Sequence, residues 1–167
     1  MQRRIKGWLL TSVAMLFSIT ATQALAAEQS LYTAENQGEF EGPAEYFSGK
    51  VHVKMAFPAN EIAHYSGAFV TFDKGARTAW HSHPAGQHMI VTQGTALTVT
   101  RDDKVVKFRS GEAVWCPPGI DHWHGATPDA SMTHFVVTAS DEKGQNVVWK
   151  EKVSDKEYRA AAQTKIH

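Results

Sequence analysis

The chain has 167 residues, with 17 Lys or Arg, 17 Asp or Glu, nine His and one Cys. Its formal net charge of zero provides no sustained basic surface, which excludes a general nucleic-acid binder. One cysteine excludes both an intrachain disulfide and a zinc site made of four thiolates. The histidines remain to be explained, because imidazole is the commonest metal ligand in proteins.

Residues 1–26 are predicted to be a secretory signal peptide. Three basic residues precede an apolar run over residues 8–21, and Ala24-Leu25-Ala26 provides the small side chains of a cleavage site. The run of about 14 residues is shorter than the ~20 that a membrane-spanning helix requires, which disfavours an uncleaved anchor. Cleavage near Ala26 predicts a mildly acidic, periplasmic or secreted protein with no membrane contact.

The rest of the chain is predicted to be one all-β domain between an N-terminal arm, residues 27–45, and a C-terminal helix and tail, residues 154–167. Residues 46–153 alternate short runs rich in Val, Thr, Phe and Trp with turns that contain Gly, Pro or Asp. Strands at this spacing predict an antiparallel sandwich or barrel rather than βαβ units. The expected strands cover residues 51–55, 65–72, 77–83, 87–93, 95–101, 104–108, 113–116, 122–126, 131–138 and 147–152.

Two local signals refine this outline. The strands on either side of Asp102-Asp103 are expected to form a β-hairpin. Ser154 and Glu157 have the spacing of a capping box, which predicts a short helix that continues over residues 158–163.

Four side chains in the middle of the chain have the pattern of a metal site. His81 and His83 are two residues apart on a predicted strand, so both point to the same face of the sheet. Gln87 begins the next strand, and His122 follows a bend that contains Pro and Gly. Three imidazoles and an amide oxygen inside a barrel would hold a divalent first-row transition metal. The alternative is that these histidines are surface or core residues without a metal.

The spacing of these residues resembles that of the cupin superfamily. The pattern G-x5-H-x-H-x3-Q-x6-G, from Gly75 to Gly94, resembles the first cupin motif, and G-x5-P-x-G-x2-H-x3-A, from Gly111 to Ala126, resembles the second. The resemblance implies a single-domain cupin, a double-stranded β-helix or jelly-roll barrel. This sequence departs from the usual motifs at Gln87, where most metal-binding cupins have Glu, and at Ala126, where Asn is usual.

A narrower resemblance accounts for both departures. Residues 75–87, 122–126 and 132–134, together with the flanking segments 42–49 and 153–159, are similar to small bacterial manganese-dependent hydroxynitrile lyases. The resemblance implies that the metal, with manganese expected and iron, nickel, zinc or cobalt as alternatives, binds to four residues. These are His81, His83, Gln87 and His122. It also implies a small-molecule substrate, a cyanohydrin whose hydroxyl binds the metal, and the protein is expected to be a homodimer or homotetramer.

Gln87 has a physical consequence for the reaction. A Glu ligand would offset one unit of the metal's charge, whereas Gln and three neutral imidazoles offset none. A site that keeps its full positive charge favours ionisation of a bound hydroxyl and disfavours oxidation of the metal. Gln87 therefore favours a lyase over a quercetinase-like dioxygenase, which stays an alternative with iron, nickel or manganese. The third hypothesis is a periplasmic cupin that only binds a small ligand.

The lyase reaction needs a base, and two histidines are candidates. His124 is two residues after His122 on the same predicted strand, so both side chains point to the same face. His134 lies at an inward position of the predicted strand 131–138. We favour His134 as the general base, because His124 is as well suited to orienting a ligand. Each is alternatively a hydrogen-bonded core residue without a catalytic role.

The same alternation predicts the walls of the pocket. The aryl group of a substrate would contact a set of inward apolar side chains, which are Ala68, Val70, Phe72, Met132 and Val136. Trp80 and Trp123 have the opposite parity and are expected to pack between sheets or at a dimer interface. Arg77 is a candidate for contact with an anionic substrate or for a surface salt bridge.

Overall fold

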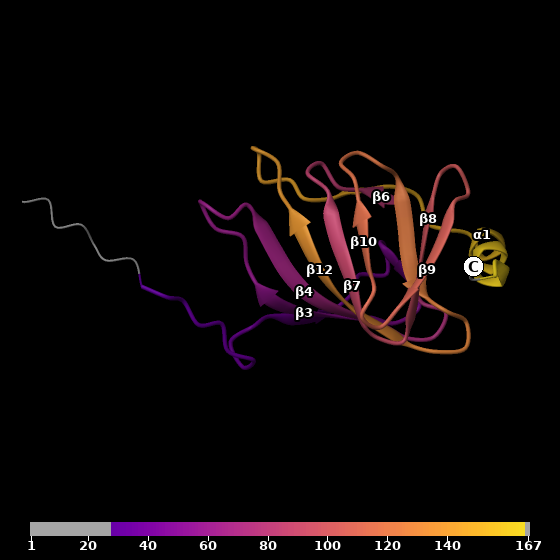
Figure 1. The fold of residues 1–167 in the computed structure, drawn as a ribbon, viewed down its shortest axis with the longest axis horizontal. Helices are drawn as coiled ribbons and strands as arrows, with labels where there is room; N and C mark the ends of the chain where they lie inside the picture. Colours follow the sequence, from indigo (N-terminus) through magenta and orange to yellow (C-terminus); the bar gives the residue numbers. More distant parts are fainter. Residues whose placement is uncertain (1–27, 166–167) are drawn as a thin grey trace, which may run out of the picture. The chain divides into compact units, whose positions relative to one another are not determined.

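The computed structural model describes residues 28–165, so the predicted signal peptide lies outside the described residues (Figure 1). Within them the chain forms thirteen strands and one α-helix, which confirms the all-β prediction with a short C-terminal helix. No helix among these residues has the length and apolar character needed to cross a membrane.

The first sheet has six antiparallel strands in the order β1-β3-β4-β12-β7-β10, and Figure 1 shows most of them side by side. Its strands are β1 (Glu39–Glu41), β3 (Val51–Phe57), β4 (Tyr65–Phe72), β12 (Met132–Ala139), β7 (Gln87–Gln93) and β10 (Ala113–Cys116). Burial alternates strictly along β12, which confirms that Met132, His134 and Val136 point inward, and Thr138 lies on the same face.

The second sheet contains β13 (Val148–Trp149), β6 (His81–Ser82), β11 (His122–Ala126), β5 (Arg77–Thr78) and β2 (Phe47–Ser48) in that order. On this sheet β11 also pairs with β8 (Thr95–Thr100), and β8 pairs with β9 (Val105–Arg109) in the predicted hairpin. The inward faces of the two sheets enclose the main hydrophobic core, in which Phe72, Met89 and Met132 are fully buried.

A second hydrophobic cluster lies on the other face of the second sheet. Helix α1 (Asp155–Gln163) begins at the predicted capping box, where Ser154 and Glu157 hydrogen-bond reciprocally. Its buried side chain Tyr158 packs in this cluster with Trp80 and Trp123. The prediction that these tryptophans lie between sheets or at a dimer interface is therefore wrong, because α1 covers them.

Arg77 is tied to the same helix. Its guanidinium donates to Asp155 at 2.6 Å and to the backbone oxygen of Val153 at 3.2 Å, and it lies 4.7 Å from the Tyr158 ring centroid. Of the two expectations for Arg77, the structure therefore shows the ion pair, with the arginine itself largely buried.

Three of the predicted segments differ in extent from the strands that the structure shows. The arm contains β1, which pairs with β3 as an edge strand and hydrogen-bonds through Glu39 to His52. The run 77–83 is divided into β5 and β6, because the amides of Ala79 and Trp80 bond to carbonyls outside the sheet ladder. The run 147–152 contains only β13.

Candidate metal centre

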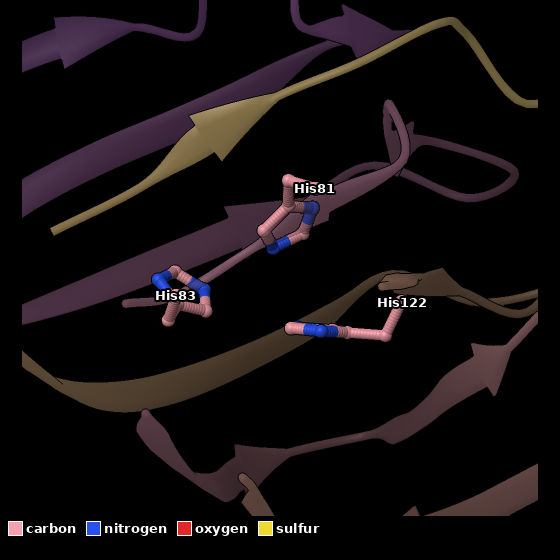
Figure 2. A group of neighbouring side chains, drawn as sticks. All are labelled: His81, His83 and His122. Carbon is pink, nitrogen blue, oxygen red and sulfur yellow. The ribbon is translucent and has the colours of Figure 1, made fainter. Parts of the chain in front are cut away.

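Three histidines from neighbouring segments of the second sheet meet inside the barrel. His81 is on β6, His83 follows it directly, and His122 begins β11, where it is the register partner of His81. One ring nitrogen from each lies within 4.8 Å of the others, and Figure 2 shows the three rings facing a common space. The structure thus brings together the three histidines that the sequence selected.

Hydrogen bonds to the backbone determine which nitrogen of each ring is available. In all three histidines Nδ1 faces a backbone carbonyl, which can only accept, so Nδ1 carries the hydrogen and Nε2 keeps its lone pair. The three pairs are His81 with Ala79 at 3.0 Å, His83 with Asn146 at 2.6 Å and His122 with Ile120 at 3.0 Å. Three Nε2 atoms are therefore prepared to act as ligands.

Gln87, the first residue of β7, is buried and lines a cavity together with His81 and His83. The turn before Gln87 contains Gly86, which has a φ of 85°. Any other residue there would be strained, because its Cβ atom would lie 2.2 Å from the Trp115 ring. Gln87 Nε2 donates to Thr138 Oγ1 at 2.9 Å, while Oε1 is buried and accepts no hydrogen bond from the described residues.

The donor set fits a bound cation. Within the described part of the chain, His83 Nε2, His122 Nε2 and Gln87 Oε1 are all buried acceptors without a partner. An unsatisfied buried polar atom costs about 1–3 kcal/mol, so several in one place need an explanation. A divalent transition metal would satisfy all of them at once, and imidazole and amide groups suit many such metals.

Burial also keeps these rings in the form that binds metal. It lowers the pKa of His81 and His122, and it lowers the pKa of His83 to about 4, although the hydrogen bond to the Asn146 backbone oxygen and the nearby Gln87 side chain raise that pKa in part. All three imidazoles are therefore neutral at pH 7, and metal binding has no proton to displace from them.

The two candidate bases are adjacent to this cluster. The rings of His124 and His134 lie 5.0 Å apart, and the His124 ring lies 5.1 Å from that of His81. His134 is 0% exposed, and neither of its ring nitrogens has a hydrogen-bond partner in the described residues. Burial lowers its pKa to about 3, so the ring is neutral at pH 7 and one of its nitrogens keeps a lone pair.

A cavity of about 240 Å³ is lined by two members of this cluster, His81 and His83, together with Gln87, His124 and His134. Its predicted apolar liners are present except Met132, which lies in the hydrophobic core outside this cavity. The liners that the sequence correctly predicted are Ala68, Val70, Phe72 and Val136.

The remaining side of the cavity was missed by the sequence-based prediction. Trp149 packs with its ring centroid 4.9 Å from that of His81 and 4.7 Å from that of Tyr46, and Asn146 and Val147 precede it. Val53 and Met55 also line the cavity, and the alternation of β3 could have predicted them. The segment before β13 has no periodic pattern, so nothing in the sequence indicated its residues.

Comparisons with known proteins agree with this geometry. Residues 68–138 match the family described as "Cupin domain". A cupin-like protein from Thermotoga maritima is 36% identical, and the match covers 75% of this chain and 94% of that one with a TM-score of 0.70. The polyketide cyclase RemF from Streptomyces resistomycificus shares the fold alone, with 16% identity, a TM-score of 0.59 and coverage of 79% and 92%. The chain belongs to the cupin superfamily.

One relative has a name that states a specific enzyme activity. The chain is 43% identical over 124 residues to an (R)-mandelonitrile lyase from Granulicella tundricola, which covers 74% of this chain and 94% of that protein. The similarity therefore extends over nearly the whole length of a curated lyase.

Proposed function

We propose that this cupin is an exported metal-dependent lyase that cleaves or forms cyanohydrins. The proposal is supported by the 43% identity to an (R)-mandelonitrile lyase and by the histidine cluster that could hold a metal. The observation that carries it is the cavity that His81, His83 and Gln87 line together with a buried, neutral His134.

His81, His83, His122 and Gln87 would hold the metal, for which we propose manganese. When bound, the divalent ion supplies Lewis acidity, which favours loss of a proton from a substrate hydroxyl. Because all four side chains are neutral, they leave the positive charge of the site undiminished. The apolar wall formed by Ala68, Val70 and Phe72 would hold the organic group of the substrate and exclude water from the reacting atoms.

His134 would move the proton. A neutral ring nitrogen of His134 would accept the proton of the cyanohydrin hydroxyl. The hydroxyl oxygen then forms a carbonyl as the bond between its carbon and the nitrile carbon breaks. That bond's electron pair leaves with cyanide, which then takes the proton from His134 to give hydrogen cyanide and an aldehyde. His124, between His134 and His81, would keep the His134 ring in place.

Cyanide release from mandelonitrile by manganese-loaded protein tests the proposal. We expect turnover by the wild type, background release by His83→Ala, and retained metal with a rate about 10²–10⁴-fold lower in His134→Phe. His88→Ala is the matched control, because His88 follows Gln87 on β7 but is exposed outside the barrel. If metal-loaded wild type releases no more cyanide than His83→Ala, the lyase proposal is wrong. Oxygen uptake with a catechol or flavonol would then favour a dioxygenase.

A further inference from the structure

Thr138 is a buried hydroxyl whose position no part of the proposed proton transfer explains. It lies near the end of β12 and is the register partner of Gln87 on β7. Thr138 Oγ1 accepts the hydrogen bond from Gln87 Nε2 at 2.9 Å, and both side chains line the cavity. The hydrogen bond is itself buried, so water does not readily replace it.

The orientation of the Gln87 amide decides whether it can be a ligand. The two ends of a primary amide have nearly the same shape, but only the carbonyl oxygen can bind a cation. With Nε2 on Thr138, Oε1 is the end left buried without a partner among the described residues. Nearby His83 Nε2 is also a buried acceptor without a partner, so it would attract the NH₂ end of a reversed amide.

We propose that Thr138 is a positioning residue that holds the Gln87 amide with its oxygen toward the metal centre. The inference rests on the proposed metal site and adds the residue that orients its fourth ligand. Thr138 acts by giving the NH₂ end of the amide a buried partner. Without this hydroxyl, that end would turn to the lone pairs of the histidines, and the carbonyl oxygen would point away from them.

Three single variants first test this role through metal affinity, measured by titration calorimetry with manganese or zinc at neutral pH. Thr138→Val keeps the shape and removes the acceptor, so we expect metal binding about 10–100-fold weaker, the range typical of groups that orient a ligand. Thr138→Ser restores the hydroxyl and is expected to bind within about threefold of the wild type. Ser66→Ala is the matched control, because Ser66 lines the same cavity and pairs with Thr138 on the side away from Gln87.

Introducing Thr138→Val into a Gln87→Glu protein distinguishes orientation of the amide from a general structural role. A carboxylate has oxygen at both ends, so its orientation does not decide whether it can bind a metal. We therefore expect Thr138→Val to weaken binding less than about threefold when residue 87 is Glu, although it weakens binding strongly when residue 87 is Gln. Equal losses in both backgrounds would indicate a merely structural role and overturn the inference, as would wild-type affinity in Thr138→Val. Failure of the wild type itself to bind metal would instead refute the proposed metal site.

Discussion

Strand β11 presents two buried faces that differ in how well their polar atoms are satisfied. His122 and His124 point into the barrel, where His122 Nε2 and His124 Nδ1 have no partner in the described residues. Trp123 points the other way, is 1% exposed and packs against Tyr158 of α1. The Tyr158 hydroxyl in turn donates to the backbone oxygen of Ala126 at the end of the same strand.

The difference distinguishes the face of β11 that stabilises the fold from the face that we propose to be functional. On the helix side, burial of large apolar surface stabilises the fold, and the Tyr158 hydroxyl has a partner. On the barrel side, unsatisfied nitrogens cost folding free energy that a ligand would recover on binding. One five-residue strand therefore combines a stabilising face with the face that we propose to bind metal. Substitutions at neighbouring positions should separate the two.

The largest effect is expected from His122→Ala on the barrel face. This variant removes one of three clustered imidazoles, so stoichiometric metal binding should be lost, as measured by metal analysis after dialysis. The metal-free variant should keep the β-rich circular dichroism spectrum of the wild type, because Trp123 and the helix contacts are unchanged. Full retention of one metal per chain would remove His122 from the site.

Trp123→Ala tests the opposite face. Loss of this buried indole should lower the free energy of unfolding by about 3–5 kcal/mol, measured by urea denaturation of metal-free protein. The folded fraction should still bind metal with wild-type affinity, because the side chain points away from the histidines. A large loss of affinity in folded Trp123→Ala would show that the two faces are coupled.

The pH dependence of stability should reveal the buried His134. Its pKa is about 3 in the folded protein and about 6.5 when unfolded, so between these values the unfolded chain binds the extra proton. Its contribution is therefore fully present above pH 6.5 and is lost as the pH falls, by about 2 kcal/mol between pH 6.5 and 5. Urea denaturation of metal-free protein at the two pH values measures this loss, and His134→Leu should show a correspondingly smaller one. An unchanged pH dependence in that variant would contradict the assignment.

The smallest effect is expected at the start of the helix that closes the outer face. Ser154→Ala removes the side chain that accepts from the Glu157 amide and should cost about 1 kcal/mol. Thermal unfolding measures it, with Ser154→Thr as the conservative control that keeps the hydroxyl. Metal affinity should not change in either variant.

Periodicity explains how much of the site could be predicted from sequence. The two-residue spacing of His81 and His83 and the alternation of β12 place side chains on a face with no knowledge of the fold, and the structure agrees with both. The capping box likewise depends only on Ser154 and Glu157, and it is confirmed. Such local signals were sufficient for the fold class and for the histidine cluster.

What could not be predicted depends on partners far apart in the sequence. Parity indicates that Trp123 points away from His122, but it does not show that α1 covers it. The hydrogen bond from Gln87 to Thr138 depends on the register between β7 and β12, which are 51 residues apart at these positions. Asn146 and Trp149 enter the site from the two-residue strand β13 and the loop before it, which are too short for a periodic pattern.

The contact between Trp149 and His81 makes the protein a reporter of its own occupancy. The indole lies 4.9 Å from the imidazole of this proposed ligand, measured between ring centroids, which is close enough for its excited state to sense a change at that ring. An open-shell ion such as manganese should therefore quench Trp149 emission more than closed-shell zinc does. The difference in fluorescence between the two metals, absent in Trp149→Phe, would follow loading of the site without any added dye or substrate.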